Sequence, residues 1–440
     1  MLNLRPRRGL ALPHRELEAW PALPAPPSRL LLPLRHSRLD QSEPVVRPGQ
    51  RVAAGEPLSL PLGLAARVVC SPLAGRVRRV DVLSVVHPPL RDGSPRGALP
   101  VPCVELDELS APSLEERTDW QQLERPALLE RLRPWGLTGA EGLPLDLELE
   151  LLSGEARLLV LGVAPAQALQ DALLEQVPAA LARAVTALCR LHGFRELLLA
   201  CPPVHSEARR RWLALLEPIL PARCVVLRQG HPWDQPRLAA LALGRPLPSP
   251  RRPLAAQGLL ALTLDQLAAL ELRLSTGLPL PPLVCQLDDL PEPHGLPQPR
   301  SCRVLRAWPG TPLSELDPAL PQPGEWLVAG LPLEGSPLLE GGTPLLPGHT
   351  LLSRLPRLKS PEAEEACIHC GQCLDICPMR LAPIRLVRLA GEERLEEARG
   401  LGLEHCVHCG LCSWICPSRV ELEDGLRRAR QRLREARHGG

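Results

Sequence analysis

The chain has 440 residues, of which 45% are hydrophobic, and it carries a formal net charge of +2 at pH 7. This length and apolar content suffice for several domains with buried cores, and the near-neutral charge argues against a nucleic-acid partner. No segment reaches about 18 consecutive apolar residues, so no membrane-spanning helix is predicted. The prolines and charges of residues 1–14 argue against a secretory signal.

Residues 1–110 form the first predicted unit, a β-rich module. A short strand is expected at 29–34, and apolar strands broken by Pro-Gly and Ala-Gly turns follow at 46–52 and 68–77. The turn pattern resembles the barrel-sandwich hybrid of biotinyl and lipoyl carriers. Such carriers need a lysine at a hairpin tip, and the single lysine of this chain, Lys359, lies elsewhere. The module is therefore predicted to be structural.

A charged, Leu-rich helical connector is predicted over residues 111–154, and an α/β (Rossmann-like) domain over 155–278. Apolar strand patterns alternate with amphipathic helices, which predicts a parallel sheet with right-handed crossovers. Ligands of such sheets bind at the carboxyl ends of the strands. The first loop there, 162–167, lacks the G-x-G-x-x-G fingerprint. The expected strands are 157–163, 196–200 and 224–227, and the expected helices are 168–191 and 206–216.

Residues 279–355 are rich in proline and glycine around short apolar pieces, which predicts a small β-grasp-like (SLBB-type) domain. Residues 361–437 form the last predicted unit, an α-helical ferredoxin-like domain. Its helices are expected at 382–401 and 420–437, between and after two cysteine runs. The whole chain is thus predicted to be a multidomain α/β plus β protein.

Eight of the fifteen cysteines lie in two runs, 367–378 and 406–417, each with the spacing C-x2-C-x2-C-x3-C-P. This is the bacterial [4Fe–4S] run, in which the fourth cysteine ligates the other cluster of a two-cluster protein. We therefore predict two [4Fe–4S] clusters. The ligands of the first are Cys367, Cys370, Cys373 and Cys416, and those of the second are Cys377, Cys406, Cys409 and Cys412.

Zinc is the alternative occupant of such cysteines. A zinc site needs four ligands, usually as two separated C-x-x-C pairs, and this pattern fits it poorly. The cluster thiolates and the unpatterned cysteines indicate a reducing compartment, the cytoplasm. Seven cysteines outside the runs are interpreted as packed thiols: Cys70, Cys103, Cys189, Cys201, Cys224, Cys285 and Cys302.

The order of these modules resembles the C subunit of the Rnf ion-translocating electron-transport complex. The resemblance rests on the turn pattern of 46–77, the α/β middle domain, the Pro-Gly-Thr-Pro piece at 309–312 and the two cysteine runs. The family's middle domain is similar to the NADH- and FMN-binding flavoprotein subunit of respiratory complex I. The resemblance implies a peripheral subunit on the cytoplasmic side of the bacterial inner membrane, bound to the other subunits of the complex.

The segments that bind flavin in the family are altered here. The loop 161–167 lacks the family's acidic residues, although Asp171 matches one acid of a following segment, and 231–237 departs from the family's Y-P-x-G-x-E-K. Pro165 and Pro236 have no backbone N–H to offer a phosphate. FMN and NADH therefore stay open as cofactors, with Gly162 and Asp171 as the candidate residues.

The resemblance implies that the chain relays electrons through its two clusters, between NADH or a protein electron donor or acceptor and its membrane partners. It would thus be an electron-transfer subunit of an oxidoreductase and translocase complex. Its own NADH dehydrogenase activity is left open, and no catalytic residue is assigned. Two alternatives remain: a flavin-less relay or assembly subunit, which includes a diverged paralogue, and an iron–sulfur subunit of another soluble oxidoreductase.

Overall fold

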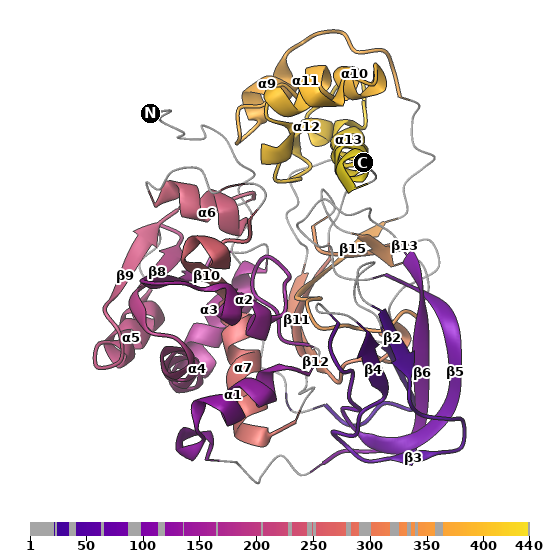
Figure 1. Ribbon diagram of the computed structural model, residues 1–440, viewed down its shortest axis with the longest axis vertical. Coiled ribbons are helices and arrows are strands. Elements are labelled where there is room, and N and C mark those ends of the chain that lie inside the picture. Colours follow the sequence, from indigo (N-terminus) through magenta and orange to yellow (C-terminus); the bar gives the residue numbers. More distant parts are fainter. Residues whose placement is uncertain are drawn as a thin grey trace.

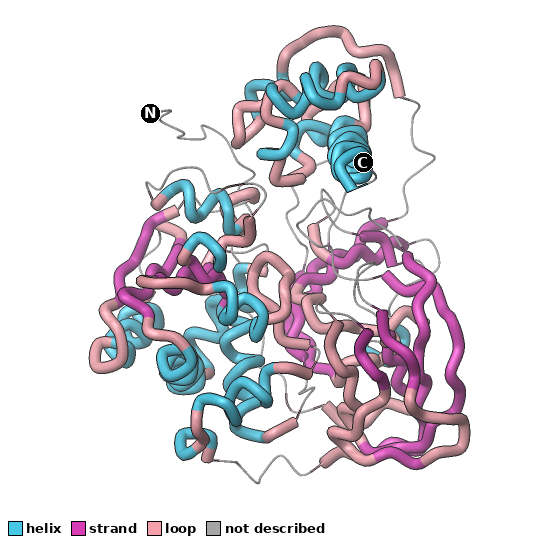
Figure 2. Tube along the Cα trace, viewed as in Figure 1, coloured by secondary structure: helices cyan, strands magenta, loops and turns pink. Residues whose placement is uncertain are grey.

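The fold is taken from a computed structural model of the chain (Figures 1 and 2). The expectations for residues 1–14, Pro165 and Lys359 lie outside the described residues. Those described are 22, 24–34, 41–62, 66–86, 98–112, 119–134, 136–163, 166–203, 206–227, 231–243, 249, 252–278, 283–289, 301–316, 325–331, 336–338, 342–356 and 364–438.

The N-terminal module is β-rich, as predicted, and its strands pair antiparallel. The barrel-sandwich assignment itself stays a prediction. One sheet has the order β1-β6-β5-β3, and a second pairs β2 with β4. Leu31 of β1 donates its backbone N–H to the carbonyl of Gly310, which joins the 309–312 piece to this module. Gly310 has φ +89°, and a Cβ there would lie 2.9 Å from the Leu31 carbonyl oxygen, so only glycine fits. The strands are β1 (Leu30–Pro33), β2 (Gln41–Pro44), β3 (Arg51–Val52), β4 (Ser59–Leu62), β5 (Ala74–Val86) and β6 (Ala98–Ser110).

The middle of the chain contains a parallel four-stranded sheet with the order β10-β7-β8-β9. The parallel pairing of the first three predicted strands is confirmed, and the fourth strand, β10, was not predicted. Figure 1 shows helices α3, α4, α5 and α7 gathered beside this sheet. Its elements are β7 (Ala156–Leu161), α3 (Gln167–Gln176), α4 (Pro178–Leu191), β8 (Phe194–Cys201), α5 (Glu207–Leu216), β9 (Ala222–Val226), α6 (Pro236–Ala242), β10 (Leu259–Thr263) and α7 (Leu264–Thr276).

The single helix expected over 168–191 is wrong. It is two helices, α3 and α4, which meet at an angle of 92° with Pro178 at the first position of α4. Proline lacks the N–H that a continuous helix needs at that point and is favoured at the start of a new one. Among the described residues no single helix has the length and apolarity to cross a membrane, whereas this bent pair satisfies both criteria together.

The two faces of the sheet are covered differently. One face packs against α3, α4, α5 and α7, and the same apolar core includes residues of α1 (Arg125–Leu132) and α2 (Leu145–Leu151) from the predicted connector. The other face, which carries Leu161 and Ala200, packs against α6 and against loops of the C-terminal cysteine domain. The sheet therefore lies between helices on one face and α6 with loops of the cysteine domain on the other.

A five-stranded sheet of order β12-β11-β15-β13-β14 follows, where a β-grasp-like domain is predicted. Its core includes Cys285 and Leu352, and the Gln286 side chain accepts a hydrogen bond from the Leu169 backbone of α3. The β-grasp assignment itself stays a prediction. The elements are β11 (Leu283–Asp289), β12 (Ser301–Ala307), α8 (Leu313–Leu316), β13 (Glu325–Ala329), β14 (Ser336–Leu338) and β15 (Leu351–Pro356).

The cysteine domain is helical, as predicted, and forms a group of its own in Figure 1. The single helix expected over 382–401 is wrong: α10 ends at Gly391 and α11 begins at Leu395. The last predicted helix is α13. Apolar residues of α10 and α13, such as Leu386 and Leu426, form the core of this domain. The helices are α9 (Gln372–Ile376), α10 (Pro383–Gly391), α11 (Leu395–Gly400), α12 (Leu411–Trp414) and α13 (Leu422–His438).

Candidate metal centre

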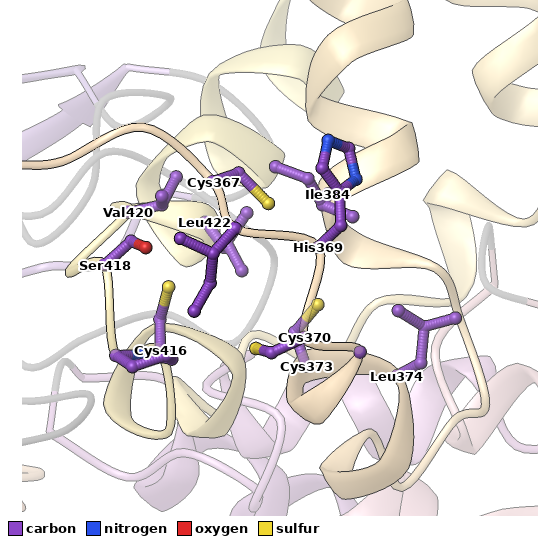
Figure 3. Close-up of a pocket in the computed structure, with 13 residues that line it drawn as sticks. Cys367, His369, Cys370, Cys373, Leu374, Ile384, Cys416, Ser418, Val420 and Leu422 are labelled. Carbon is purple, nitrogen blue, oxygen red and sulfur yellow. The ribbon is translucent and has the colours of Figure 1, made fainter.

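Four thiols surround a first cavity of about 100 Å³ in the cysteine domain. Three come from the first run and the fourth comes from the end of the second run. Figure 3 shows their sulfur atoms turned toward a common space, while the His369 ring points away toward α10, where its Nε2 lies 3.2 Å from Arg388 Nη2. The four thiols belong to Cys367, Cys370, Cys373 and Cys416.

A second, tighter cavity of about 20 Å³ is lined by the other four cysteines, Cys377, Cys406, Cys409 and Cys412. The one cysteine that the first run contributes here is Cys377. It lies four residues after Cys373 of the first cavity, and the charge of Cys373 opposes its ionisation. Each cavity thus takes three thiols from one run and one from the other. Among the described residues, no three or more His, Cys, Asp or Glu side chains are placed to hold a single metal ion. The ligand assignment stays a prediction.

The two runs repeat the same backbone path, 39 residues apart. The residue before the second cysteine is left-handed in both, with φ of 57° at His369 and 54° at His408. Arg380 and Arg419, which follow the Cys-Pro pairs, have φ of 53° and 56°. Non-glycine residues rarely adopt this conformation, and such strain concentrates at functional sites. The repeat therefore holds two loops in a costly conformation that curls each around its cavity.

Glycines begin the short helices that carry the third cysteine of each run. Gly371 and Gly410 have φ of 79° and 75° and are the N-caps of α9 and α12. Because a residue without a Cβ adopts this conformation at low cost, the chain reverses sharply between the second and third cysteines. Both loops therefore turn three sulfurs toward one space.

Backbone N–H groups are directed at the sulfurs. The Leu381 N–H donates to Cys377 Sγ across 3.4 Å, and the amides of Met379 and Arg380 also favour the Cys377 thiolate. The Leu411 amide does the same for Cys409. Hydrogen bonds to sulfur stabilise the negative charge of a thiolate–cluster unit and set its reduction potential. These donors fit a [4Fe–4S] group.

Without bound metal the thiols of the second cavity are held neutral. Burial raises the pKa of Cys406 to about 12, and burial likewise raises the pKa of Cys409 far above its usual range. The Cys377 thiol opposes ionisation of Cys406, Cys409 and Cys412, which places it electrostatically with that set. Since only thiolates ligate iron, a cluster bound by these cysteines would require the release of their protons.

The surroundings of the two cavities differ. Ile368 of the first run is 66% exposed and Cys370 is exposed, whereas Cys409 and Cys412 are buried. From inside the domain, Arg430 of α13 donates to the Cys406 carbonyl across 3.1 Å. The second run is therefore enclosed, while the first faces outward.

The second run also lies against the α/β domain. Val407, Cys409 and Leu411 belong to one apolar cluster with Leu161 and Ala200 of the sheet. Ile376 and Trp414 also pack against this apolar cluster. The same residues that line the second cavity or flank it thus cover a face of the sheet.

One polar contact accompanies this packing, and sequence reasoning missed it. His231 Nε2 lies 2.7 Å from the Cys409 carbonyl oxygen, and its Nδ1 lies 3.1 Å from Asp234 Oδ1. His231 is 0% exposed and Asp234 is buried. The signal was present as a His-Pro-Trp-Asp segment after the third strand, but no spacing links it to a cysteine run 178 residues away.

The candidate cofactor residues Gly162 and Asp171 are brought together through Gln167. Its amide Nε2 donates to the Gly162 carbonyl across 3.0 Å and to Asp171 Oδ1 across 3.1 Å. A Cβ on Gly162 would lie 2.9 Å from the Ala200 carbonyl oxygen, so close strand packing alone explains this glycine. A flavin role for the two residues stays a prediction.

The cysteine domain contains the sequence signature of a known class. Residues 366–420 match the family model of the 4Fe-4S dicluster domain. This match covers both cysteine runs, and it supports two iron–sulfur clusters as the occupants. The chain is thus similar to dicluster iron–sulfur proteins in the part that carries its chemistry.

Most of the chain is related in sequence to one component of a larger assembly, which confirms the resemblance to the Rnf C subunit. It is 28% identical over 401 residues to the C subunit of the ion-translocating oxidoreductase complex of Pseudomonas aeruginosa, covering 86% of this chain and 49% of the relative. For the protein of the same name from Cronobacter sakazakii the identity is 25%, over 82% of this chain and 46% of the relative. The relative from Rhodobacter capsulatus is 25% identical over 88% of this chain and 74% of its own length. The chain spans about half the length of the first two.

Among solved structures, the chain is similar to an NAD+-reducing [NiFe]-hydrogenase in the H2-reduced state, with a TM-score of 0.46 and 13% identity over 74% of this chain and 63% of that one.

Proposed function

We propose that the chain is an electron-relay subunit that holds two [4Fe–4S] clusters. The observation that carries the proposal is the exchange of Cys377 and Cys416 between two neighbouring cavities, each of which then has four thiols. The match of residues 366–420 to the dicluster domain supports it. Bound clusters of this type supply one-electron transfer.

The residues of the chain would hold the two clusters, orient their ligands and shield the thiols from water. Cys373 and Cys377 lie four residues apart and serve different cavities, so the ligands of the two clusters are linked by one short helix, α9. The amides of Met379, Arg380 and Leu381 favour the charged form of Cys377. Apolar residues around the second cavity, such as Leu411, keep water away from the thiols. Together they provide two fixed, neighbouring one-electron sites.

We further propose the setting that the relatives' name suggests. The chain would act in a complex that couples electron transfer, on an NADH or ferredoxin side, to ion translocation. Its partners would be the other subunits of an Rnf-type complex and a protein electron donor or acceptor. It would be peripheral, on the cytoplasmic side of the inner membrane. Sequence similarity over 82–88% of this chain supports this setting.

A relay without a flavin is the second candidate, and one observation favours it. Residues His231, Trp233 and Asp234 occupy the segment that departs from the family's pattern, and all three are buried. His231 is bonded to the cluster loop, so its ring is committed to another part of the chain. In this version the α/β domain would be a support for the cluster domain.

The proposal is tested on anaerobically purified protein. About eight irons per chain, broad absorbance near 400 nm and the EPR signal of reduced cubanes after dithionite are expected. Released FMN together with NADH-dependent bleaching selects the flavin-bearing version, and iron without flavin or NADH response selects the second candidate. A colourless protein that contains zinc would refute both.

A further inference from the structure

The contact between His231 and the second cysteine run also bears on the second cluster itself. It joins a fully buried imidazole in the α/β domain to the backbone of a predicted cluster ligand, Cys409. A carbonyl oxygen can only accept, so Nε2 carries the hydrogen of this 2.7 Å bond. Asp234 Oδ1, 3.1 Å from Nδ1, fixes the orientation of the ring.

We propose that His231, oriented by Asp234, is a positioning residue that fixes the second cysteine run and tunes the reduction potential of the second cluster alone. This rests on the proposed function, because it presupposes that the two cavities hold clusters. The lining residues of both cavities come from the cysteine domain, and His231 of the α/β domain is bonded to the backbone of the second run, at Cys409. The two otherwise repeated sites therefore differ in this contact.

His231 would act on the second cluster through the Cys409–Gly410 peptide, whose carbonyl accepts its hydrogen bond. The bond to its carbonyl fixes the orientation of the Cys409–Gly410 peptide, immediately before the Leu411 N–H that favours the Cys409 thiolate. Reduction adds a negative charge to the cluster and its sulfurs, and N–H groups directed at sulfur stabilise that charge. Loss of the His231 bond lets the loop turn these donors away, so reduction becomes less favourable.

A second anchor shows that the run is held from two sides. Arg430 of α13 donates to the carbonyl of Cys406, the first cysteine of the same run. Arg430 belongs to the cysteine domain itself, whereas His231 belongs to the α/β domain. The potential of the second cluster thereby depends on how the two domains are docked.

Packing and hydrogen bonding can be separated experimentally. Water is excluded from this interface by Leu411, Val407 and Trp233, which are buried in the shared apolar cluster. His231→Leu keeps an apolar side chain among them and removes both the N–H donor to Cys409 and the Nδ1 contact with Asp234. His231→Gln keeps a donor of similar reach. Asp234→Asn keeps the imidazole but replaces the carboxylate beside its Nδ1 with a neutral amide. His192→Leu, at the opposite end of the sheet before β8, is the matched control.

The test is an EPR-monitored redox titration of the intact protein, with the first cluster identified by Cys370→Ser. His231→Leu should shift the oxidised-to-reduced equilibrium of the second cluster at least threefold toward the oxidised form, about 28 mV for a one-electron couple. The first cluster should not move, His231→Gln should restore most of the shift, and Asp234→Asn should give a smaller shift of the same sign.

Equal shifts of both clusters, no shift, or failure of His231→Gln to restore the potential would overturn the inference. If His231→Leu does not accumulate, the comparison of His231→Gln, Asp234→Asn and wild type decides the matter, with an unshifted Asp234→Asn counting against it. A wild-type chain without iron would instead refute the proposed function. Eight irons with potentials insensitive to position 231 would refute the inference alone.

Discussion

If the two runs exchange their fourth cysteines, cysteine variants should lose iron in a different pattern than if each run held its own cluster, which we call the uncrossed arrangement. Cys377 belongs to the first run in sequence but lines the second cavity with Cys406, while Cys370 lines the first. Replacement of Cys377 by alanine removes one of four ligands from a single cluster. Iron should fall from about eight to about four atoms per chain, because a [4Fe–4S] cluster is lost as a unit.

Double variants turn this into a decisive comparison. If Cys377 and Cys406 serve the same cluster, Cys377→Ala/Cys406→Ala still retains about four irons, because the second loss affects a cluster that is already absent. Cys377→Ala/Cys370→Ala instead removes both clusters and leaves almost none. In an uncrossed arrangement the two results are exchanged.

The assay is iron content per chain on anaerobically purified protein, together with the EPR spectrum after dithionite. Cys224→Ala is the control for the loss of an exposed thiol outside the runs and should keep about eight irons. Retention of about four irons by Cys377→Ala/Cys370→Ala and loss of all iron by Cys377→Ala/Cys406→Ala would refute the crossed assignment.

Three further outcomes follow from the packing. Gly162→Ala should lower the free energy of unfolding by about 1–3 kcal/mol, since its Cβ would lie 2.9 Å from the Ala200 carbonyl oxygen; Gly193→Ala, with nothing within 4 Å, should be near neutral in the same urea titration. Arg427→Met should cost about 3–5 kcal/mol, because it leaves Glu423 buried without its 2.6 Å partner, and Arg427→Met/Glu423→Leu should cost less than Arg427→Met alone. Burial raises the pKa of the Cys285 thiol to about 12 from 9.0. The neutral thiol therefore makes its full contribution to the free energy of unfolding below pH 9, and this contribution is lost as the pH rises toward 12. The free energy of unfolding, measured from pH 8 to 10.5, should fall with pH, and it should fall less steeply in Cys285→Ala.

Elements with a strong local signal were predictable, and those made by distant contacts were not. The three strands β7, β8 and β9 are short apolar runs between polar turns, and α5 (Glu207–Leu216) lies within the expected helix 206–216. The break between α3 and α4 was overlooked although Pro178 marks it, because apolar residues continue on both sides. The fourth strand, β10, pairs with β7 across about 100 residues, and its apolar pattern is too short to identify alone.

In the candidate site, too, the residues with a local sequence pattern were predictable and the contacts between domains were not. Spacing within 12 residues predicted all eight cysteines that line the two cavities, because each run is one continuous loop. The anchor at His231 and the cover that the second run provides for the sheet depend on domain docking, which no local pattern encodes. A lone buried histidine in a sequence is more often a packed side chain than a functional one, so its role emerges only from its partners.

The two runs nevertheless differ at matched positions, and these differences explain which one is enclosed. Leu411 of the second run is 0% exposed against the sheet, while its counterpart in the first run, Gln372, is exposed. Val407 is 9% exposed, and its counterpart Ile368 is 66% exposed. These positions are covered where the α/β domain supplies a surface, so the repeated cysteines line both cavities while the residues between them decide which run is enclosed.

Exchange of the matched residues tests this reasoning directly. Leu411→Gln places an amide in an apolar interface, where an unsatisfied polar group costs about 1–3 kcal/mol. We expect chelator-driven iron loss from the second cluster to accelerate several-fold and to approach the rate of the first. Gln372→Leu, the reverse change at an exposed position, should alter neither rate. Equal acceleration by both variants would mean that the docking of the second run against the sheet does not protect its cluster.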